Sequence, residues 1–254
     1  MTILFVGVIA CCSGKSEDGV PLIFAAASLS DVLTESADIY ERDTGKRVDF
    51  SFGGSITLAN QVANLGAPAD GVLFAGGEPG QLIIKAGLML GGNAQRVITN
   101  SVVVIGGRDF PVIRSLADLA LSNERIAVAD PQLAPAGTYA MLALEAAGLA
   151  ETISDQLIFT GDVRAALAAV ESGNTKYGIV YMTDALTSNR VEILFEIQDL
   201  SVDYFITGIT EAHNSRAAQT FLNYVLIESA TREVFKSAGF EVRRAGTGPG
   251  DPGG

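Results

Sequence analysis

Short apolar segments alternate with longer amphipathic segments along most of the chain. Runs rich in Val, Ile, Phe and Ala predict strands over residues 22–26, 47–52, 72–74, 101–105, 125–129, 156–159, 177–181, 191–197 and 204–209. Apolar residues spaced by three and four predict helices between them, including 78–86, 115–122, 215–229, 230–238 and one that begins at Ser28. The regular alternation of strand and helix predicts an α/β fold with a mixed, mainly parallel sheet.

At four junctions a strand ends in small residues and a helix follows directly. Ser28 stands at the first junction and Ser55 at the second, and Ser28 and Ser30 both suit an N-cap. The third opens with Pro135-Ala136-Gly137 and the fourth with Gly161-Asp162-Val163. Free N–H groups and the helix dipole make each junction an anion site in outline. Taken alone, each is also an ordinary capped helix, so the prediction depends on the set.

Length and charge narrow the class of ligand. The chain has 254 residues, which allows one large domain or two lobes. Its formal net charge is −12, from 17 Lys and Arg against 29 Asp and Glu. Nucleic-acid binding needs clustered Lys and Arg, so the charge argues against a nucleic-acid partner. It also repels anions at long range, so an anion site here must work through local donors.

The two ends of the chain differ from the rest. An apolar run at 3–10 is too short to span a bilayer as a helix, and Val8-Ile9-Ala10-Cys11 resembles a bacterial lipoprotein cleavage box with Cys11 as the lipidated residue. No Lys or Arg precedes the run, which leaves a buried first strand with two incidental thiols as the alternative. We expect 1–20 to be a leader and tether, and the Gly- and Pro-rich 243–254 to be a disordered tail.

The polar residues do not form a catalytic set. A serine hydrolase needs a base beside its nucleophile, but the single histidine, His213, precedes a C-terminal helix and is expected on the surface. No His, Cys or carboxylate cluster has the spacing of metal ligands. Asp162 and Asp184 suit helix caps better than catalytic acids, and Arg164 is expected to pair with Asp130 or Asp162. We therefore expect a binding protein and not an enzyme.

Six motifs occur along the chain in a fixed order. They are FAAASL, SFGGSITLA, GAPAD, AVADP followed by PAGTYA, GDVRAALAAVESG and GIVYMTDA. In order and wording they resemble the periplasmic molybdate-binding proteins of molybdate ABC transporters. The resemblance covers about residues 21–242. Its most specific parts are the loop from ADP to PAGTYA and the spacing from DVR to GIVY.

This resemblance implies a type II periplasmic binding protein, in which two α/β lobes close around an oxyanion. One lobe would comprise 21–98 with 206–242, and the other 99–205. Position by position, the family's ligand contacts fall on Ser28, Ser55, Ala136, Val163 and Tyr181. The resemblance further implies an ABC permease as partner and a location outside the cytoplasmic membrane. We expect a monomer, anchored by lipid, with no cofactor besides the transported anion.

Such a site would hold its ligand with hydroxyl and backbone N–H donors and no cation. A shell of donors suits a fully deprotonated tetrahedral anion, whereas the proton on hydrogen phosphate would meet a donor with nothing to accept it. Tungstate is nearly the size of molybdate, so we expect both to bind. A binding protein or sensor of the same fold for another oxyanion, such as sulfate, remains the alternative.

The chain departs from the family pattern at three positions near the predicted site. Phe74 and Gly76 stand where the family often has serine and aspartate, and Gly54 replaces a hydroxyl residue next to Ser55. None of the three is an expected ligand contact. We expect them to alter the cleft wall or the hinge, and to lower affinity without changing the class of ligand.

Overall fold

The structure is a computed structural model that describes residues 19–91, 98–107, 111 and 113–242. Cys11, most of the predicted leader and the predicted tail 243–254 lie outside these residues.

The described strands form one nine-stranded sheet in the order β2-β1-β3-β8-β4-β7-β5-β6, with β9 paired to β4. Their bounds are β1 (Leu22–Ala26), β2 (Asp49–Gly53), β3 (Gly71–Ala75), β4 (Ile98–Gly107), β5 (Ile126–Ala129), β6 (Leu157–Thr160), β7 (Tyr177–Tyr181), β8 (Val191–Gly208) and β9 (Glu241–Val242). Strand β1 pairs in parallel with β2 and β3, and β5 pairs in parallel with β6 and β7. The pairs made by β4 and β8 are antiparallel. The sheet is therefore mixed, with a parallel part at each end.

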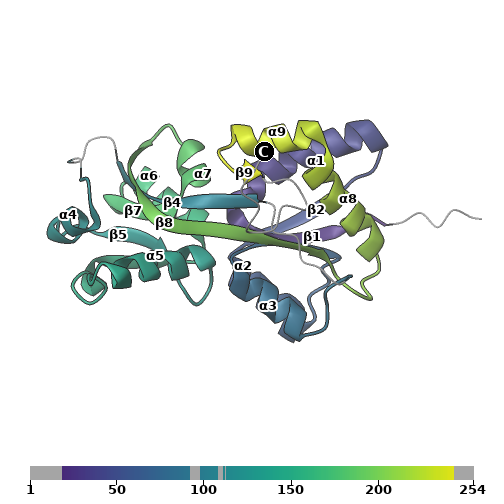
Figure 1. The fold of residues 1–254 in the computed structure, drawn as a ribbon, viewed down its shortest axis with the longest axis horizontal. Coiled ribbons are helices and arrows are strands. Elements are labelled where there is room, and N and C mark those ends of the chain that lie inside the picture. The colour runs from purple at the N-terminus through teal and green to yellow at the C-terminus, as the bar shows by residue number, and fades with distance from the viewer. Residues whose placement is uncertain (1–18, 92–97, 108–110, 112, 243–254) are drawn as a thin grey trace, which may run out of the picture.

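Helices cover both faces of each end of the sheet (Figure 1). Their bounds are α1 (Ser30–Thr44), α2 (Ser55–Leu65), α3 (Gly77–Lys85), α4 (Leu116–Leu121), α5 (Pro135–Ala146), α6 (Val163–Glu171), α7 (Met182–Leu186), α8 (Ser215–Ile227) and α9 (Ser229–Ser237). We call β1–β3 with α1–α3, α8 and α9 the first lobe, and β5–β7 with α4–α7 the second lobe. In the first lobe α1, α8 and α9 lie on one face, and α2 and α3 on the other.

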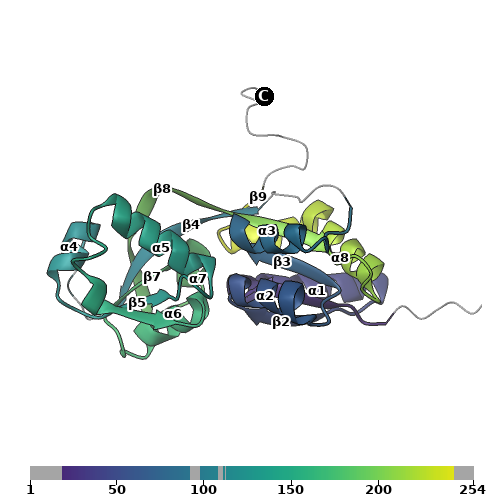
Figure 2. The same cartoon turned by 90° about the horizontal axis from the view of Figure 1, so that it is seen from below.

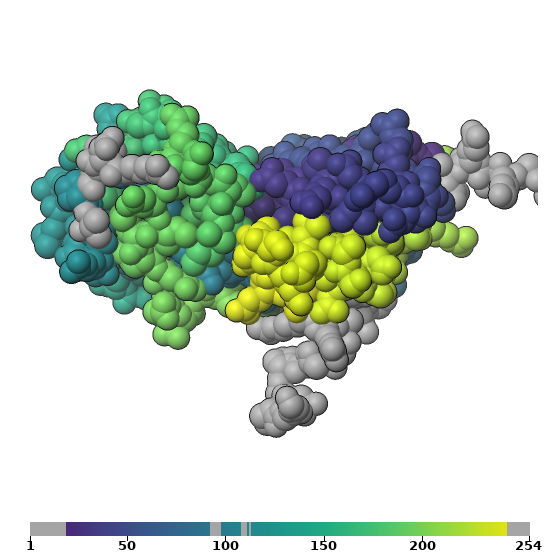
Figure 3. All heavy atoms as spheres, turned by 90° about the horizontal axis from the view of Figure 1, so that it is seen from above, coloured from purple at the N-terminus to yellow at the C-terminus, as the bar shows by residue number. Residues whose placement is uncertain are grey.

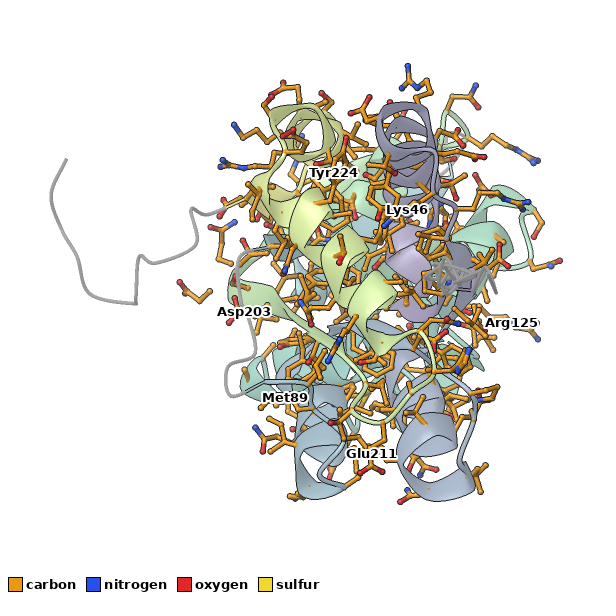
Figure 4. The ribbon with its side chains drawn as sticks, turned by 90° about the vertical axis from the view of Figure 1, so that its right-hand side faces the viewer. Lys46, Met89, Arg125, Asp203, Glu211 and Tyr224 are labelled. Atoms are coloured by element: carbon orange, nitrogen blue, oxygen red, sulfur yellow. The ribbon has the colours of Figure 1, made fainter. Side chains whose placement is uncertain are left out.

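The C-terminal helices complete the first lobe although they follow the second in sequence. Seen from above, the N-terminal and C-terminal segments lie side by side on one surface (Figure 3). Tyr224 of α8 and Lys46, just past the end of α1, face the same end of the molecule (Figure 4), and the Tyr224 hydroxyl bonds to the Asp43 carboxylate. The chain therefore leaves the first lobe, builds the second, and returns.

The return runs through one long strand, which corrects the sequence prediction. Separate strands over 191–197 and 204–209 were expected, but β8 is continuous over 18 residues. The polar stretch between the two apolar runs resembles a loop in sequence, yet Ser201, Val202 and Asp203 all pair with β4. Beyond them, Tyr204–Gly208 pairs with β3. Because β8 pairs with strands of both lobes, it joins them directly (Figure 2).

The lobes share a large buried core. It contains Ile23 and Leu33 of the first lobe, Val128 and Leu167 of the second, and the middle of β4. A smaller cluster around Phe74 and Ile83 lies beneath α2 and α3. Within the described ranges, no helix is long and apolar enough to cross a membrane.

Candidate functional site

All five residues predicted to contact the ligand line a single pocket between the lobes. Its lining residues are Ala26, Ala27, Ser28, Gly53, Gly54, Ser55, Ala75, Ala134, Pro135, Ala136, Asp162, Val163 and Tyr181. The cavity among them has a volume of about 10 Å³, which is about the space that one water molecule needs. None of these lining residues is Lys or Arg, so a bound anion would meet hydroxyl and N–H groups.

Four chain segments start helical turns at this pocket. Ser55 and Val163 are the first residues of α2 and α6, and Ala136 is the second residue of α5. The first N–H groups of a helix have no partner inside it, and the helix dipole places positive charge there. Ser28 differs from its prediction, because it lies in a 3-10 turn (Ala27–Leu29) before α1. Together the four segments can offer several backbone donors to one anion.

The expected serine caps of α1 are absent. The N-cap of α1 is Leu29, and neither Ser28 nor Ser30 makes a capping bond with its side chain. The Ser28 hydroxyl is instead engaged by Tyr204 of β8. A side chain held by a distant strand is not available to its own helix, and this is why the local prediction is wrong.

The Ser55 hydroxyl is oriented by a strand of its own lobe. Its Oγ accepts a hydrogen bond from the Ala75 backbone N–H at 3.1 Å, and the residue is buried. A serine hydroxyl has one hydrogen and two lone pairs. Since Oγ is used here as an acceptor, its hydrogen remains for another partner, and Ser55 lines the pocket.

The Ser28 hydroxyl is oriented by a chain of buried polar groups. Its Oγ lies 3.0 Å from the Tyr204 hydroxyl, and Asn100 Nδ2 donates to that same hydroxyl at 3.3 Å. The amide of Asn100 is held by the Ser101 N–H, which donates to Oδ1, and by Thr183 Oγ1, which accepts from Nδ2. Tyr204 accepts from Asn100, and in its contact with Ser28 either hydroxyl can be the donor; when Tyr204 donates, the Ser28 hydrogen is left to point elsewhere.

Tyr181 presents a different situation. Its hydroxyl is buried and has no hydrogen-bond partner among the described residues. Burial, with the nearby Tyr204 hydroxyl, raises the pKa of the Tyr181 phenol well above its usual value, so the group is a neutral donor. A buried polar group without a partner costs about 1–3 kcal/mol. The site therefore contains one buried, neutral donor that has no acceptor among the described residues.

Arg164 pairs with other carboxylates than those expected. Its Nη2 lies 2.7 Å from Asp31 of α1, and its Nε lies 2.5 Å from Asp184 of α7. The expected partners are engaged by backbone instead: Asp130 Oδ1 accepts from the Gln132 N–H and Asp162 Oδ1 from the Ala165 N–H. Because Asp31 belongs to the first lobe and Arg164 to the second, this ion pair joins the lobes beside the pocket.

The two aspartates proposed as helix caps have different roles. Asp162 is the N-cap of α6, as predicted. Asp184 is not a cap, because Tyr181 holds that position in α7. Its side chain is fully buried against Arg164, and burial raises the pKa of this carboxyl to about 7, although Arg164 favours the charged form. His213 is exposed, as expected. The described residues contain no group of three or more His, Cys, Asp or Glu able to hold a metal ion.

The three positions that depart from the family pattern also lie close to the cleft. Gly54 lines the pocket. Gly76 has a φ of +76°, and a Cβ added there would lie 2.9 Å from Pro135 of the second lobe. Phe74 is completely buried in the smaller core beneath α2 and α3. Two of the three substitutions therefore fall where the lobes meet.

Comparison with known proteins agrees with this geometry. The family model described as "Bacterial extracellular solute-binding protein" matches residues 21–241. The chain belongs to this family. It is 33% identical over 237 residues to the molybdate-binding protein ModA of Escherichia coli (strain K12), covering 90% of this chain and 91% of the relative. This match confirms the resemblance proposed from the six motifs.

Two further relatives widen the comparison. The chain is 31% identical to the putative ABC transporter substrate-binding lipoprotein YvgL of Bacillus subtilis (strain 168), over 90% of this chain and 89% of the relative. The solved structure of the sulfate-binding protein SubI from Mycobacterium tuberculosis H37Rv superposes with a TM-score of 0.77 at 19% identity, covering 88% of this chain and 86% of that one. The likeness to SubI confirms the predicted periplasmic binding protein fold for this member of the solute-binding family.

Sequence reasoning missed the polar groups behind the pocket. Tyr204 bonds to Ser28 across 176 positions of the chain, Asn100 bonds to Tyr204 across 104, and Asp31 bonds to Arg164 across 133. One signal was available in the sequence, because Asn100 is a polar residue next to the strand predicted over 101–105. A polar residue inside a buried strand needs a hydrogen-bond partner, and that requirement could have singled it out.

Proposed function

We propose that this protein is an extracytoplasmic substrate-binding protein that captures molybdate, and tungstate as well, and delivers it to an ABC transporter permease. The ligand would bind as the oxyanion between the lobes, in contact with Ser28, Ser55, Ala136, Val163 and Tyr181. Its role is binding and delivery, without chemical conversion of the anion. The relatives at 33% and 31% identity support this assignment by their names.

One observation carries the proposal: the Tyr181 phenol has no hydrogen-bond partner in the part of the chain that the structure describes, and it lies in a pocket built from helix N-termini. A buried hydroxyl with no acceptor is costly, and a dianion in the pocket would supply one. Ser28 and Ser55 support the same conclusion, since the Ser55 oxygen accepts from the Ala75 N–H and the Ser28 hydroxyl is held by Tyr204, which allows both hydrogens to be directed at an anion. Hydrogen bonds to a charged acceptor are about twice as strong as neutral ones.

The donor set also supports selectivity for a fully deprotonated anion. Hydrogen phosphate carries a proton that would face Ser28, Ser55 or Tyr181, and a hydroxyl that accepted this proton would no longer be turned to donate to the anion. Asp162 is the one carboxylate in the lining, and its Oδ1 accepts from the Ala165 N–H in the cap of α6. Sulfate has no such proton, so only its smaller size would exclude it.

The same proposal includes the location and the division of the chain. We propose that the protein is attached to the membrane through a lipid on Cys11, which the lipoprotein name of the Bacillus subtilis relative supports. We also propose that it carries the anion as a monomer. We also propose the lobe boundaries 21–98 with 206–242 and 99–205. They fall near the start of β4 and near the point at which β8 changes its pairing from β4 to β3.

Titration calorimetry and thermal unfolding with four anions test the function. Molybdate and tungstate should bind and raise the melting temperature, because a ligand at 100 times its Kd stabilises the folded state by about 2.7 kcal/mol. Phosphate should do neither at equal concentration. Stabilisation by sulfate alone would assign the protein to the alternative class of sulfate binders. No stabilisation by any of the four would contradict the proposal.

A further inference from the structure

Helix α2 has no cap of its own at its N-terminus. A Ser, Thr, Asp or Asn at the N-cap position usually accepts a hydrogen bond from the backbone N–H of the second or third helical residue. In α2 the N-cap is Gly54, and no side chain makes that bond. The N–H of Thr57, the third residue of the helix, therefore has no partner within α2.

The missing bond is supplied by the other lobe. The Thr57 N–H donates to the Leu133 carbonyl oxygen at 3.1 Å, and the Thr57 hydroxyl lies 3.4 Å from that oxygen. Leu133 lies in the segment between β5 and α5, which faces α2 across the junction of the lobes (Figure 2). Gly54 and Ala134, the neighbours of these groups, both line the pocket. The cap of α2 is therefore an interaction between lobes, made next to the anion site.

The absent side chain at position 54 also sets how closely the lobes approach. A Cβ built on Gly54 would lie 2.6 Å from the Leu133 oxygen and 2.9 Å from the Gly161 oxygen. Both are main-chain atoms, which cannot rotate away as a side chain can. The backbone of Gly54 has φ −63° and ψ 125°, which any residue adopts. Contact with the second lobe, and not backbone conformation, is what requires glycine here.

We propose that Gly54 makes the capping of α2 depend on closure of the cleft. With the lobes together, Leu133 caps the first turn of α2; with the lobes apart, that turn has no cap. Ser55 is the first residue of the same turn, so an anion that draws the lobes together also orders the segment that holds it. Gly54 and Thr57 are positioning residues in this scheme. The effect of the anion rests on the proposed function, whereas the link between capping and closure does not.

Amide hydrogen exchange at Thr57, followed by NMR on the full chain, tests the link. In the wild type, saturating molybdate should slow this exchange by about tenfold or more. Gly54→Ser adds a cap within the helix and a side chain that obstructs closure. Exchange at Thr57 should then be slow without anion and should not change when molybdate is added. Molybdate affinity should fall by about tenfold or more.

Two variants separate the cap from the collision. Gly54→Ala obstructs closure without capping, so affinity should fall as in Gly54→Ser while exchange at Thr57 stays fast. Gly77→Ser is the matched control, because Gly77 is the first residue of α3 and a Cβ there meets no atom within 4 Å. It should leave both molybdate affinity and Thr57 exchange at wild-type values. A loss of affinity in Gly77→Ser equal to that in Gly54→Ser would overturn the inference.

A comparison without anion keeps this test separate from the proposed function. Asp31→Asn removes the ion pair with Arg164, which joins the lobes without touching α2. It should speed Thr57 exchange in the wild-type background and leave it unchanged in Gly54→Ser. Failure of molybdate to bind the wild type would contradict the proposed function and leave this comparison to decide the link. The inference would be overturned if the rate of Thr57 exchange changed neither in Asp31→Asn nor on addition of molybdate to a protein that binds it.

Discussion

The two lobes bring their polar groups to the pocket in different states. In the first lobe, Ser28 and Ser55 are buried and already hydrogen-bonded to Tyr204 and Ala75. In the second lobe, the Tyr181 hydroxyl has no partner among the described residues. The first lobe is thus organised before a ligand arrives, whereas the second contains a polar group that only a ligand or solvent can satisfy.

The difference extends behind the pocket. Asp184 of the second lobe is fully buried, and its Oδ2 has no hydrogen-bond partner within the described ranges. Its charged neighbour is Arg164, whose second contact is Asp31 of the first lobe. Unsatisfied buried groups in native proteins often accompany function. The comparison therefore predicts that substitutions in the first lobe remove binding, whereas substitutions in the second alter both binding and stability.

The largest effect is expected from the first lobe. Replacing Ser28 and Ser55 together by alanine should weaken molybdate binding by about a hundredfold or more, because a hydrogen bond to a charged group contributes about 1.5–3 kcal/mol. The fold should persist, since both residues are small. Calorimetry measures the affinity, and Ser36→Ala is the control, since Ser36 is a buried serine of α1 that bonds to the Val32 carbonyl. Wild-type affinity in the double variant would contradict the site assignment.

The serine contacts also mark what sequence could and could not reveal. The four strand–helix junctions are local features, because small residues, a hydroxyl and a helix start follow one another within a few positions. The motifs at these junctions, compared with a known family, gave the five site residues that the pocket brings together. Most helices and strands were predicted for the same reason, since a strand or helix is encoded by its own periodicity.

Hydrogen-bond and ion-pair partners that lie far apart in the chain could not be predicted from local periodicity. The pairing of Ser28 with Tyr204 and of Arg164 with Asp31 depends on how the lobes fold and meet, and no spacing within the chain specifies it. The continuous β8 was missed because its middle is mostly polar and exposed. Exposed positions need no apolar residues, so the sequence shows no strand pattern there, although the backbone pairs with β4. Tertiary pairing here overrides local propensity.

The buried carboxyl of Asp184 in the second lobe can be tested through the pH dependence of the free energy of unfolding. Its folded-state pKa of about 7 lies above the value of about 4 expected in the unfolded chain. Between these values the folded protein retains a proton that the unfolded chain loses. The free energy of unfolding due to this group is therefore highest near pH 4 and falls as the pH rises towards 7, by at most about 1.4 kcal/mol per unit.

Urea unfolding of the wild type and of Asp184→Asn at several pH values measures this effect. Relative to the variant, the wild type should lose about 2 kcal/mol of unfolding free energy between pH 5 and 7. Asp184→Asn is the reference for the wild type, because the two proteins share all other titrating groups. A difference that does not change with pH would mean that Arg164 outweighs burial and keeps Asp184 ionised throughout.

Two buried tyrosines allow a direct test of satisfied against unsatisfied groups. Tyr181→Phe removes a hydroxyl with no partner among the residues described, so the free energy of unfolding without anion should stay the same or rise, while molybdate affinity falls about tenfold. Tyr204→Phe removes a hydroxyl that bonds to Asn100 and Ser28, so it should lower the unfolding free energy by about 1 kcal/mol. Tyr177→Phe, whose hydroxyl bonds to Pro111 away from the pocket, controls for loss of a buried phenol.

If the lobes differ as described, only Tyr204→Phe should lower the free energy of unfolding. A loss of stability in Tyr181→Phe as large as that in Tyr204→Phe would mean that the Tyr181 hydroxyl has a partner in solution before the anion binds. The polar groups of both lobes would then have hydrogen-bond partners before the anion binds, and the lobes would not differ in this respect.

The smallest effect on binding is expected at Val163. The ligand contact assigned there is the backbone N–H at the start of α6, which a change of side chain leaves in place. Val163→Ala should therefore alter molybdate affinity by less than about threefold, even though the loss of buried apolar volume lowers the unfolding free energy by about 1–2 kcal/mol. Calorimetry and urea unfolding on the same sample separate the two quantities. A tenfold loss of affinity in a stably folded variant would show that the Val163 side chain, and not its amide, shapes the site. The second lobe would then resemble the first in depending on side chains.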